Sequence, residues 1–336
     1  MIRPESAETF IQGDLSTDPI LDVRTPSEFA AGHIPGAISF PLFSDIERAE
    51  IGTLYKQVGK AEAIQKGLEF VGPRLAEFTA SAKNLSPTQT IRIHCWRGGM
   101  RSGSLAWLFD LSGFQVRVLQ GGYKAYRTYV REILGLPRNY RLIGGLTGSG
   151  KTNWLHQLAE NGAQILDLEK LACHRGSAFG KYLMPESPSQ EQFENLLAQS
   201  LQKLHSEKLI WVEEESRMIG KLILPEVVWE QFLNAPMTRI KIPVQDRIQI
   251  LKSEYLPAGN EFLKAAILRI EKKLGGERTR ESLQALEMGE YDIVVSNLLF
   301  YYDKAYLKGM GQKKPSEKVI ELHSPFSIHD LLNSGE

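Results

Sequence analysis

The 336-residue chain has little cysteine: Cys95 and Cys173 are its only two, and they lie far apart in the sequence. A disulfide framework is therefore not expected, and neither a Cys-x-x-Cys pair nor a Cys/His cluster predicts a zinc site. No apolar run is long enough to cross a membrane, and the N-terminus lacks the basic-then-apolar pattern of a secretory signal. We therefore expect a cytoplasmic protein, because a free reactive thiol fits a reducing compartment.

The chain also lacks an excess of charge, internal repeats and low-complexity tracts. It contains 40 lysines and arginines and 40 aspartates and glutamates, so its net charge is zero. A nucleic-acid partner would therefore have to bind a local basic patch. The length and a hydrophobic content of 42% predict two domains. Gly135 and Pro137 interrupt a helical pattern, which places the predicted boundary between residues 1–135 and 136–336.

Cys95 lies in the stretch HCWRGGMRS, residues 94–102. The preceding TIRIH, residues 90–94, predicts a short strand in which isoleucines alternate with Arg92. Residues 102–113 predict a helix that ends at a glycine. The cysteine is therefore expected on a strand-to-helix turn.

The composition of this turn favours a reactive thiol. Its glycines allow backbone N–H groups to point inward, and the helix N-terminus with Arg97 and Arg101 would stabilise an anion. Such surroundings lower a thiol pKa from about 8.5 into the range of roughly 3.5–7.5. The alternative is a cysteine that only packs at the end of a strand, which the flanking arginines make the weaker interpretation. The sequence therefore predicts Cys95 as a nucleophile.

Two flanking stretches resemble the signatures of a rhodanese domain. They are ILDVRTPSEFAAGHIPGAISFP at residues 20–41 and VRVLQGGYKAYR at residues 116–127. In rhodaneses the cysteine between these stretches carries sulfur as a persulfide, and the resemblance places Cys95 at that position. Five residues separate Cys95 from Arg101, one more than in the commonest rhodanese loop. The longer loop could admit a different chalcogen donor or a bulkier acceptor.

A phosphate-binding loop follows the domain boundary. Residues 140–162 contain the Walker A pattern GLTGSGKT between a predicted strand and an amphipathic helix. In this pattern backbone N–H groups surround a phosphate, the lysine adds charge, and the threonine hydroxyl can hold Mg²⁺. The predicted phosphate-binding residues are Gly145, Gly148, Ser149, Gly150, Lys151 and Thr152.

The rest of the second domain alternates strands with helices. Four apolar segments predict further strands, at residues 163–169, 208–216, 237–244 and 291–297. Repeated strand–helix units predict a parallel sheet that binds ligands at the carboxyl ends of its strands. Asp167, Glu213 and Glu214 are expected at those ends, where one of them could orient Mg²⁺ or act as a base; solvated acidic turns are the alternative.

Two further segments are candidates for substrate contact. In CHRGSAFG, residues 173–180, His174 and Arg175 could contact substrate or phosphate, although an ordinary polar loop is equally consistent with the composition. Residues 260–280 predict a helix with one apolar face and a basic face and tail. Such a run is usually a solvated face, but beside a phosphate site it is the best candidate for an RNA contact. The basic residues are Lys264, Arg269, Lys272, Lys273, Arg278 and Arg280.

Taken together, HCWRGGMRS, GLTGSGKT, HRGSAFG, EEESRMIG and YYDKAY resemble the bacterial tRNA 2-selenouridine synthase family across essentially the whole chain. The resemblance implies an N-terminal rhodanese-like α/β domain and a C-terminal P-loop NTPase-like α/β domain with a parallel sheet. It implies that selenium from selenophosphate replaces the sulfur of wobble 2-thiouridine in tRNA. It also implies that geranyl diphosphate first alkylates that sulfur, with Cys95 as the selenium carrier.

Two other functions remain open at this stage. The first is an ATP-dependent tRNA sulfurtransferase, in which the Walker A loop binds ATP and Cys95 transfers sulfur. The second is a non-catalytic module in which the rhodanese fold recognises a partner and the other domain acts as a nucleotide switch. The intact cysteine–arginine loop argues against the second, since non-catalytic modules can lose the cysteine.

Overall fold

The structure is a computed structural model and describes residues 2–174, 185–310 and 319–335. The chain divides into two compact units, each containing a parallel sheet. The first comprises Met1–Ile133 and Ser189–Gln199, and the second comprises Leu134–Pro188 and Ser200–Glu336. Residues 189–199 thus join the first unit, although the sequence analysis assigned them to the second domain.

Within its described residues, the first unit contains a five-stranded sheet in the order β1-β5-β4-β2-β3. All neighbouring strands are parallel, and β4 lies in the middle between β5 and β2. The strands are β1 (Ile2–Glu5), β2 (Ile20–Asp22), β3 (Ile38–Ser39), β4 (Thr90–His94) and β5 (Gln115–Leu119). The predicted strand at 90–94 is therefore confirmed as the central one.

Arg92 on β4 departs from the expected alternation of apolar and exposed side chains. It is fully buried, and its guanidinium donates to the carbonyl oxygens of Phe10, Gln12 and Asp18. β4 is therefore covered on both sides, as is usual for a parallel sheet.

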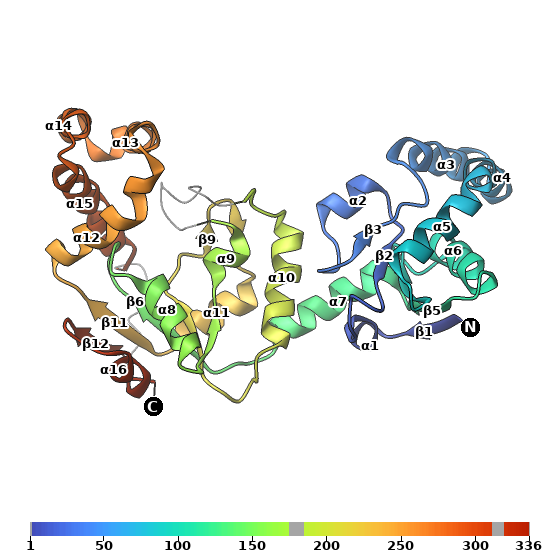
Figure 1. Ribbon diagram of the computed structural model, residues 1–336, viewed down its shortest axis with the longest axis horizontal. Helices are drawn as coiled ribbons and strands as arrows, with labels where there is room; N and C mark the ends of the chain where they lie inside the picture. Colours follow the sequence, from blue (N-terminus) through green and yellow to red (C-terminus); the bar gives the residue numbers. More distant parts are fainter. Residues whose placement is uncertain (1, 175–184, 311–318, 336) are drawn as a thin grey trace. The chain divides into compact units, whose positions relative to one another are not determined.

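Helices surround this sheet, and α3 and α4 form an adjacent pair (Figure 1). Capping boxes begin α2, with Thr25 and Glu28, and α3, with Ser44 and Glu47. The helices are α1 (Ala7–Ile11), α2 (Pro26–Ala31), α3 (Asp45–Gln57), α4 (Lys60–Val71), the 3-10 turn η1 (Gly72–Arg74), α5 (Leu75–Leu85), α6 (Met100–Leu111), α7 (Gly122–Gly135) and α10 (Gln190–Gln202). The helix predicted at 102–113 is α6.

The second unit has, within its described residues, a five-stranded parallel sheet in the order β12-β11-β6-β8-β7. A small antiparallel pair, β9 and β10, lies outside this sheet. The strands are β6 (Tyr140–Gly144), β7 (Gln164–Leu166), β8 (Ile210–Glu213), β9 (Met218–Ile219), β10 (Leu222–Ile223), β11 (Met237–Lys241) and β12 (Val319–His323). The strand before the Walker loop, β6, is central.

The helices of the second unit include a group, α12 to α15, with an apolar core of its own (Figure 1). They are α8 (Lys151–Glu160), α9 (Leu168–Ala172), α11 (Glu226–Asn234), α12 (Val244–Tyr255), the 3-10 turn η2 (Leu256–Ala258), α13 (Asn260–Leu274), α14 (Gly276–Met288), α15 (Tyr291–Met310) and α16 (Ile328–Asn333). Among the described residues, none of these helices or those of the first unit combines the length and apolarity needed to span a membrane.

The predicted strand at 291–297 is wrong, because this segment begins helix α15. Its β-branched residues favour a strand locally, but packing overrides that preference. Val294 and Leu298 are buried against α13 and α14, while Val295 and Leu299 are buried in the cluster that includes α12 residues. The spacing of four within each pair is that of a helix that packs on two sides. The predicted fold class, two α/β units with parallel sheets, is confirmed.

Candidate functional site

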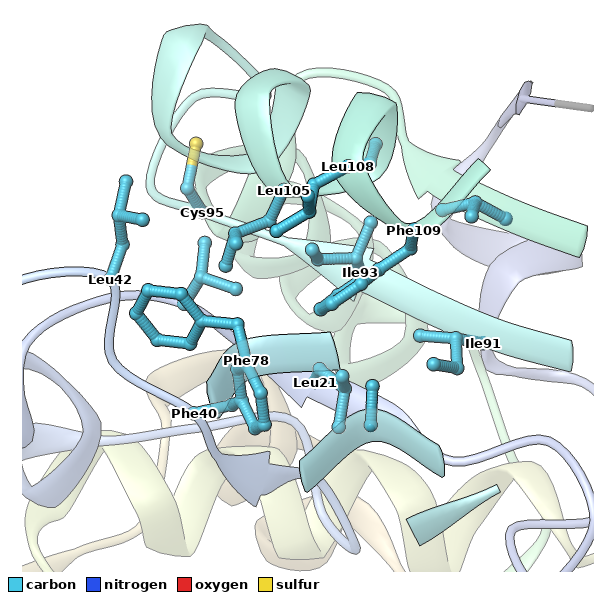
Figure 2. Close-up of a cluster of buried hydrophobic side chains, with 14 of the residues drawn as sticks. Leu21, Phe40, Leu42, Phe78, Ile91, Ile93, Cys95, Leu105, Leu108 and Phe109 are labelled. Atoms are coloured by element: carbon cyan, nitrogen blue, oxygen red, sulfur yellow. The ribbon is translucent and has the colours of Figure 1, made fainter. Parts of the chain in front are cut away.

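Cys95 lies directly after β4, at the carboxyl end of the central strand of the first sheet. The residue is 3% exposed and packs with the core cluster of that unit. Figure 2 shows it beside Leu42 and Leu105, with its sulfur pointing away from Leu21 and Ile91. The thiol is thus placed at the margin of the core, where parallel α/β sheets bind ligands.

Hydrogen-bond donors surround the sulfur. The Ser102 hydroxyl, on the first turn of α6, donates to Sγ at 3.2 Å. Burial raises the pKa of the Cys95 thiol, but this donor and the backbone N–H groups of Ser102, Arg97 and Gly99 outweigh it. The net result is a thiol pKa below the ordinary value, as the sequence predicted. The site therefore stabilises a thiolate mainly with neutral donors at the start of a helix.

The two arginines of the loop contribute less to stabilising the Cys95 thiolate than the sequence predicts. Arg97 is exposed. Arg101 donates two hydrogen bonds to the Glu28 carboxylate, at 2.6 and 3.2 Å, so its charge is already balanced. Burial raises the pKa of Glu28, but the bonds from Arg101 and from the Thr25 backbone N–H outweigh it and keep that pKa low. Arg101 therefore fixes α2 to the cysteine loop rather than pairing with the thiolate alone.

A buried ion pair lies beneath the loop. Asp22, at the end of β2, accepts hydrogen bonds from the Arg24 guanidinium at 2.6 to 3.0 Å, and both side chains are at most 1% exposed. The guanidinium carbon stacks 3.8 Å from the ring centroid of Tyr123 on α7. Neighbouring His94 is fully buried, and burial lowers its pKa to about 4, so the imidazole is neutral at physiological pH.

Gly121 and Gly122, at the start of α7, allow the backbone of the cysteine loop to approach that helix closely. Gly122 has φ +62, and a Cβ there would lie 2.4 Å from the Cys95 carbonyl oxygen. The next two residues, Tyr123 and Lys124, donate their backbone N–H groups to the carbonyls of Cys95 and Trp96 at 2.8 and 3.0 Å. The rhodanese-like signature at 116–127 thus holds the backbone of the cysteine loop.

The Walker loop of the second unit connects β6 to α8. Gly145, Gly148 and Gly150 all have positive φ, and a Cβ on Gly145 would meet the Ser149 Oγ at 2.7 Å. Ser149 is buried, and its hydroxyl has no hydrogen-bond partner among the described residues. Four of the six predicted phosphate-binding residues thus belong to the loop and the cap of α8, and Lys151 and Thr152 begin the helix.

The loop is positioned from both sides. The Lys151 ammonium donates to the Gly145 carbonyl at 3.0 Å, across the loop. Arg247 of α12 is buried and donates to the Thr147 carbonyl at 2.8 Å. The same guanidinium makes two hydrogen bonds to Asp303 of α15, at 2.6 and 3.0 Å. This clasp on the loop was not predicted from the sequence.

Of the three acidic candidates, Glu213 faces the Walker loop. It ends β8 and is buried, and burial raises its pKa to about 8. The charge of Glu169 raises this pKa further, whereas Lys151 and the Thr152 hydroxyl lower it. Its Oε1 has no hydrogen-bond partner among the described residues. Glu213 therefore keeps its proton to a higher pH than an ordinary carboxyl group beside the Walker loop.

Asp167 and Glu214 lie at strand ends as predicted, but both have other partners. Asp167 caps α9 by accepting from the Lys170 backbone N–H at 2.8 Å, and it pairs with His156 at 2.8 Å. Glu214 accepts a short hydrogen bond from the Tyr306 hydroxyl of α15. Burial, followed by the neighbouring Glu214 charge, raises the pKa of Tyr306 above its ordinary range. Both carboxylates thus also hold helices of the second unit in place, Asp167 at α8 and α9 and Glu214 at α15.

The substrate-contact candidates are only partly described. His174 packs against the β9–β10 turn, where a Cβ on Gly220 would lie 2.7 Å from its ring, and Arg175 lies outside the described residues. Arg278 is half-buried: it donates to Asn297 at 2.8 Å and stacks 3.9 Å from the Phe300 ring centroid. The other basic candidates of α13 and α14 are exposed: Lys264, Arg269, Lys272, Lys273 and Arg280.

In the part of the chain that the structure describes, no group of three or more His, Cys, Asp or Glu side chains could hold a metal ion. The Thr152 hydroxyl and Glu213 fit the different arrangement in which Mg²⁺ is held largely by phosphate oxygens. Ser102, Glu28 and Arg24 were missed as site residues. Glu28 could have been found from the capping-box spacing Thr25-x-x-Glu28, which fixes the carboxylate at the start of α2.

Sequence models of two families match the chain. The rhodanese-like domain matches residues 5–129, and the tRNA 2-selenouridine synthase AAA domain matches residues 138–333. Three bacterial proteins named tRNA 2-selenouridine synthase are similar over nearly the full length. The protein from Shewanella sediminis is 36% identical, covering 99% of this chain and 97% of its own. Those from Shewanella denitrificans and Bdellovibrio bacteriovorus are 34% and 33% identical, covering 98% and 93% of this chain and 96% and 93% of their own.

Proposed function

The chain belongs to the tRNA 2-selenouridine synthase family, and from this premise we propose that it replaces the sulfur of wobble 2-thiouridine in tRNA with selenium. We place the activity in the cytoplasm, as the sequence predicts. Selenophosphate is the selenium donor and geranyl diphosphate the activating co-substrate. The two chemical steps fall to different loops, since one needs a chalcogen carrier and the other a diphosphate site.

The first step is alkylation at the Walker loop. The thiocarbonyl sulfur attacks C1 of geranyl diphosphate, the C–O bond breaks, and diphosphate leaves with the electron pair. Lys151, the loop N–H groups and Mg²⁺ at Thr152 would stabilise that charge, which is leaving-group catalysis by electrostatics. The base loses its N3 proton, and the candidate acceptor is Glu213 in its ionised form, which Lys151 and the Thr152 hydroxyl favour.

The second step is selenium transfer at Cys95. Cys95 begins as a mixed disulfide with a small thiol, and the selenium of selenophosphate attacks its sulfur and displaces that thiol. Water then cleaves the P–Se bond and releases phosphate, so that the cysteine carries selenium as a selenosulfide. This selenium attacks C2 of the alkylated base. The C2–S bond breaks, and the geranyl thiolate leaves with its electron pair and takes a proton. A thiol from solution then attacks the Cys95 sulfur, forms a disulfide with it, and leaves the selenium on the base. Alkylation is needed because a thiocarbonyl sulfur is a poor leaving group.

The observation that carries the proposal is the set of donors around the Cys95 sulfur. Three backbone N–H groups and the Ser102 hydroxyl favour an anionic chalcogen there. The proposed tRNA contacts are His174, Arg175 and the exposed basic residues of α13 and α14, which are Lys264, Arg269, Lys272, Lys273 and Arg280.

Mass spectrometry of tRNA nucleosides tests the proposal. The protein is incubated with 2-thiouridine tRNA and geranyl diphosphate, with and without selenophosphate. We expect S-geranyl-2-thiouridine without the selenium donor and 2-selenouridine with it. In a parallel incubation of unmodified tRNA with ATP and a sulfur donor, formation of 2-thiouridine would instead identify a sulfurtransferase. The absence of any new nucleoside in both incubations would favour a non-catalytic module.

A further inference from the structure

A large cavity adjoins Cys95 within the first unit. Its volume is about 1350 Å³, above the roughly 300–1,000 Å³ of most small-molecule sites. One wall is formed by Cys95, its loop and the first turn of α6. The other is formed by the adjacent helices α3 and α4. Neither helix was assigned a role by the sequence analysis, and selenophosphate alone would leave most of this space unfilled.

The cavity is lined by large apolar side chains that remain exposed. Tyr55 of α3, Ile64 and Leu68 of α4, Trp96 of the cysteine loop and Met100 of α6 are each at least 36% exposed. Deeper lining residues, including Leu42, Phe43 and Val71, are buried in the core. Contiguous exposed apolar surface is unfavourable in water and commonly marks a ligand site. The lining therefore indicates an apolar ligand beside the thiol.

Helix α4 shows why this surface is not a by-product of folding. Ala63, Gly67 and Val71 form the buried stripe that packs into the unit. Ile64 and Leu68 form a second apolar stripe, four residues apart, that the fold leaves uncovered. One stripe would suffice to anchor an amphipathic helix. The second stripe is available for a ligand.

The charges in the cavity suit a ligand attached to nucleic acid. Four lining side chains are basic (Arg48, Lys56, Arg97 and Arg101) and two are acidic (Glu28 and Asp45). Glu28 pairs with Arg101, and Asp45 accepts from Ser27 at 2.5 Å. No ion pair within the described residues engages Arg48, Lys56 or Arg97, which leaves them for phosphate groups beside the apolar lining.

We propose that this cavity binds the S-linked geranyl chain of the alkylated tRNA base and thereby presents C2 of that base to Cys95. The inference rests on the proposed function and concerns binding only. It explains why the cysteine loop is open toward α3 and α4: a branched ten-carbon chain needs an apolar site within reach of the chalcogen. It also makes the geranyl group a recognition element, so that unalkylated 2-thiouridine tRNA is a poor ligand of the first unit.

The test uses the full chain and two matched substitutions. Leu68→Asp places a charge in the cavity, and Ile46→Asp places one on α3 at an 81% exposed position that does not line it. Both sites are exposed, so neither change should unfold the protein. Selenation is measured with tRNA that has already been geranylated, and geranyl transfer is measured separately on 2-thiouridine tRNA.

We expect Leu68→Asp to raise the KM for geranylated tRNA in selenation about tenfold or more, while Ile46→Asp leaves it unchanged. S-methyl-2-thiouridine tRNA should be selenated less efficiently, and its KM should not respond to Leu68→Asp. The free nucleoside S-geranyl-2-thiouridine should change the tryptophan fluorescence of the original protein. This change should be absent in Trp96→Phe.

Equal effects of the two aspartates, or equal use of S-methyl and S-geranyl tRNA, would overturn the cavity assignment. A raised KM for geranyl diphosphate in the transfer step, with selenation unchanged, would assign the cavity to the donor and also overturn it. Failure of the proposed function is a separate result: the original protein would then not selenate geranylated tRNA, whatever its affinity for the geranyl nucleoside.

Discussion

The pKa of the Cys95 thiol depends on two opposing effects at the scale of single residues. Burial disfavours the thiolate, and the donors at the start of α6 favour it. A hydrogen bond to a charged group contributes roughly 1.5–3 kcal/mol. Because Arg101 is neutralised by Glu28, the Ser102 hydroxyl is the side-chain donor on which the thiolate chiefly depends.

Ser102→Ala should therefore raise the thiol pKa and slow its alkylation. At neutral pH we expect the rate with iodoacetamide to fall about tenfold or more, since a factor of ten corresponds to 1.4 kcal/mol. The pH dependence of the alkylation rate, measured on the Cys173→Ala background, gives the shift directly. Ser104→Ala, which removes an exposed hydroxyl two residues further along α6, should leave the profile unchanged. Identical profiles for all variants would show that the backbone donors suffice.

Glu213 is expected to make the stability of the folded protein depend on pH. Its pKa is raised from 4.5 to about 8, so the folded state holds a proton that the unfolded state has lost between these values. Its contribution to stability is therefore present at low pH and declines as the pH rises from about 4.5 to 8.

Glu213→Gln, which stays neutral, should accordingly raise the Tm at pH 8.5 relative to the original protein and change it little at pH 5. For a domain of this size each kcal/mol corresponds to roughly 2–4 °C. Differential scanning calorimetry at the two pH values measures the difference, with the exposed Glu207→Gln as control. A Tm change that is the same at both pH values would mean that the Glu213 carboxylate is not held protonated.

At the scale of elements, helices α13 and α14 carry the candidate RNA surface. The side chains of Lys272 and Lys273 extend from the exposed end of α13, off its apolar face. Arg278 does not belong with them, because its bond to Asn297 and its stacking on Phe300 hold α14 against α15. Replacing Arg278 would remove a packing contact and a charge together, so their effects on tRNA binding could not be separated.

Lys272→Ala combined with Lys273→Ala should weaken tRNA binding and flatten its dependence on salt. Each lost phosphate contact lowers the slope of log K against log salt by about 0.7–0.9. Filter binding over a series of salt concentrations gives the slope, and circular dichroism should show unchanged helix content. The pair Lys203→Ala and Lys208→Ala, also exposed on the second unit, is the control. If both double variants bind alike, α13 is a solvated face.

Some of these elements can be predicted from the sequence alone, and others cannot. Both candidate loops lie between a strand and a helix as predicted, because glycine patterns of this kind are local in sequence. The helix at 291–297 was missed, since its β-branched residues are held in helical form by α12, α13 and α14, contacts that no local pattern contains. The pairing of Arg101 with Glu28 spans 73 positions and was missed for the same reason. The second apolar stripe of α4 could have been found from Ile64 and Leu68.

At the scale of the whole molecule, the two loops occupy equivalent positions in separate units. Each follows the central strand of a parallel sheet and begins a helix whose N-terminus favours an anion. In the proposed function the Walker loop stabilises the departing diphosphate, and the cysteine loop carries the nucleophilic chalcogen. The account therefore predicts two half-reactions that can be disabled one at a time.

The most direct measurement combines two variants with two substrates. Cys95→Ser and Lys151→Ala are each incubated with selenophosphate, geranyl diphosphate and either 2-thiouridine tRNA or tRNA that has already been geranylated, and the nucleosides are quantified by mass spectrometry. Cys95→Ser should accumulate the geranylated nucleoside and form no 2-selenouridine from either tRNA. Lys151→Ala should lose about 10²–10³-fold in geranyl transfer and yet selenate the geranylated tRNA. Full selenation by Cys95→Ser, or equal failure of Lys151→Ala with both tRNAs, would contradict the account.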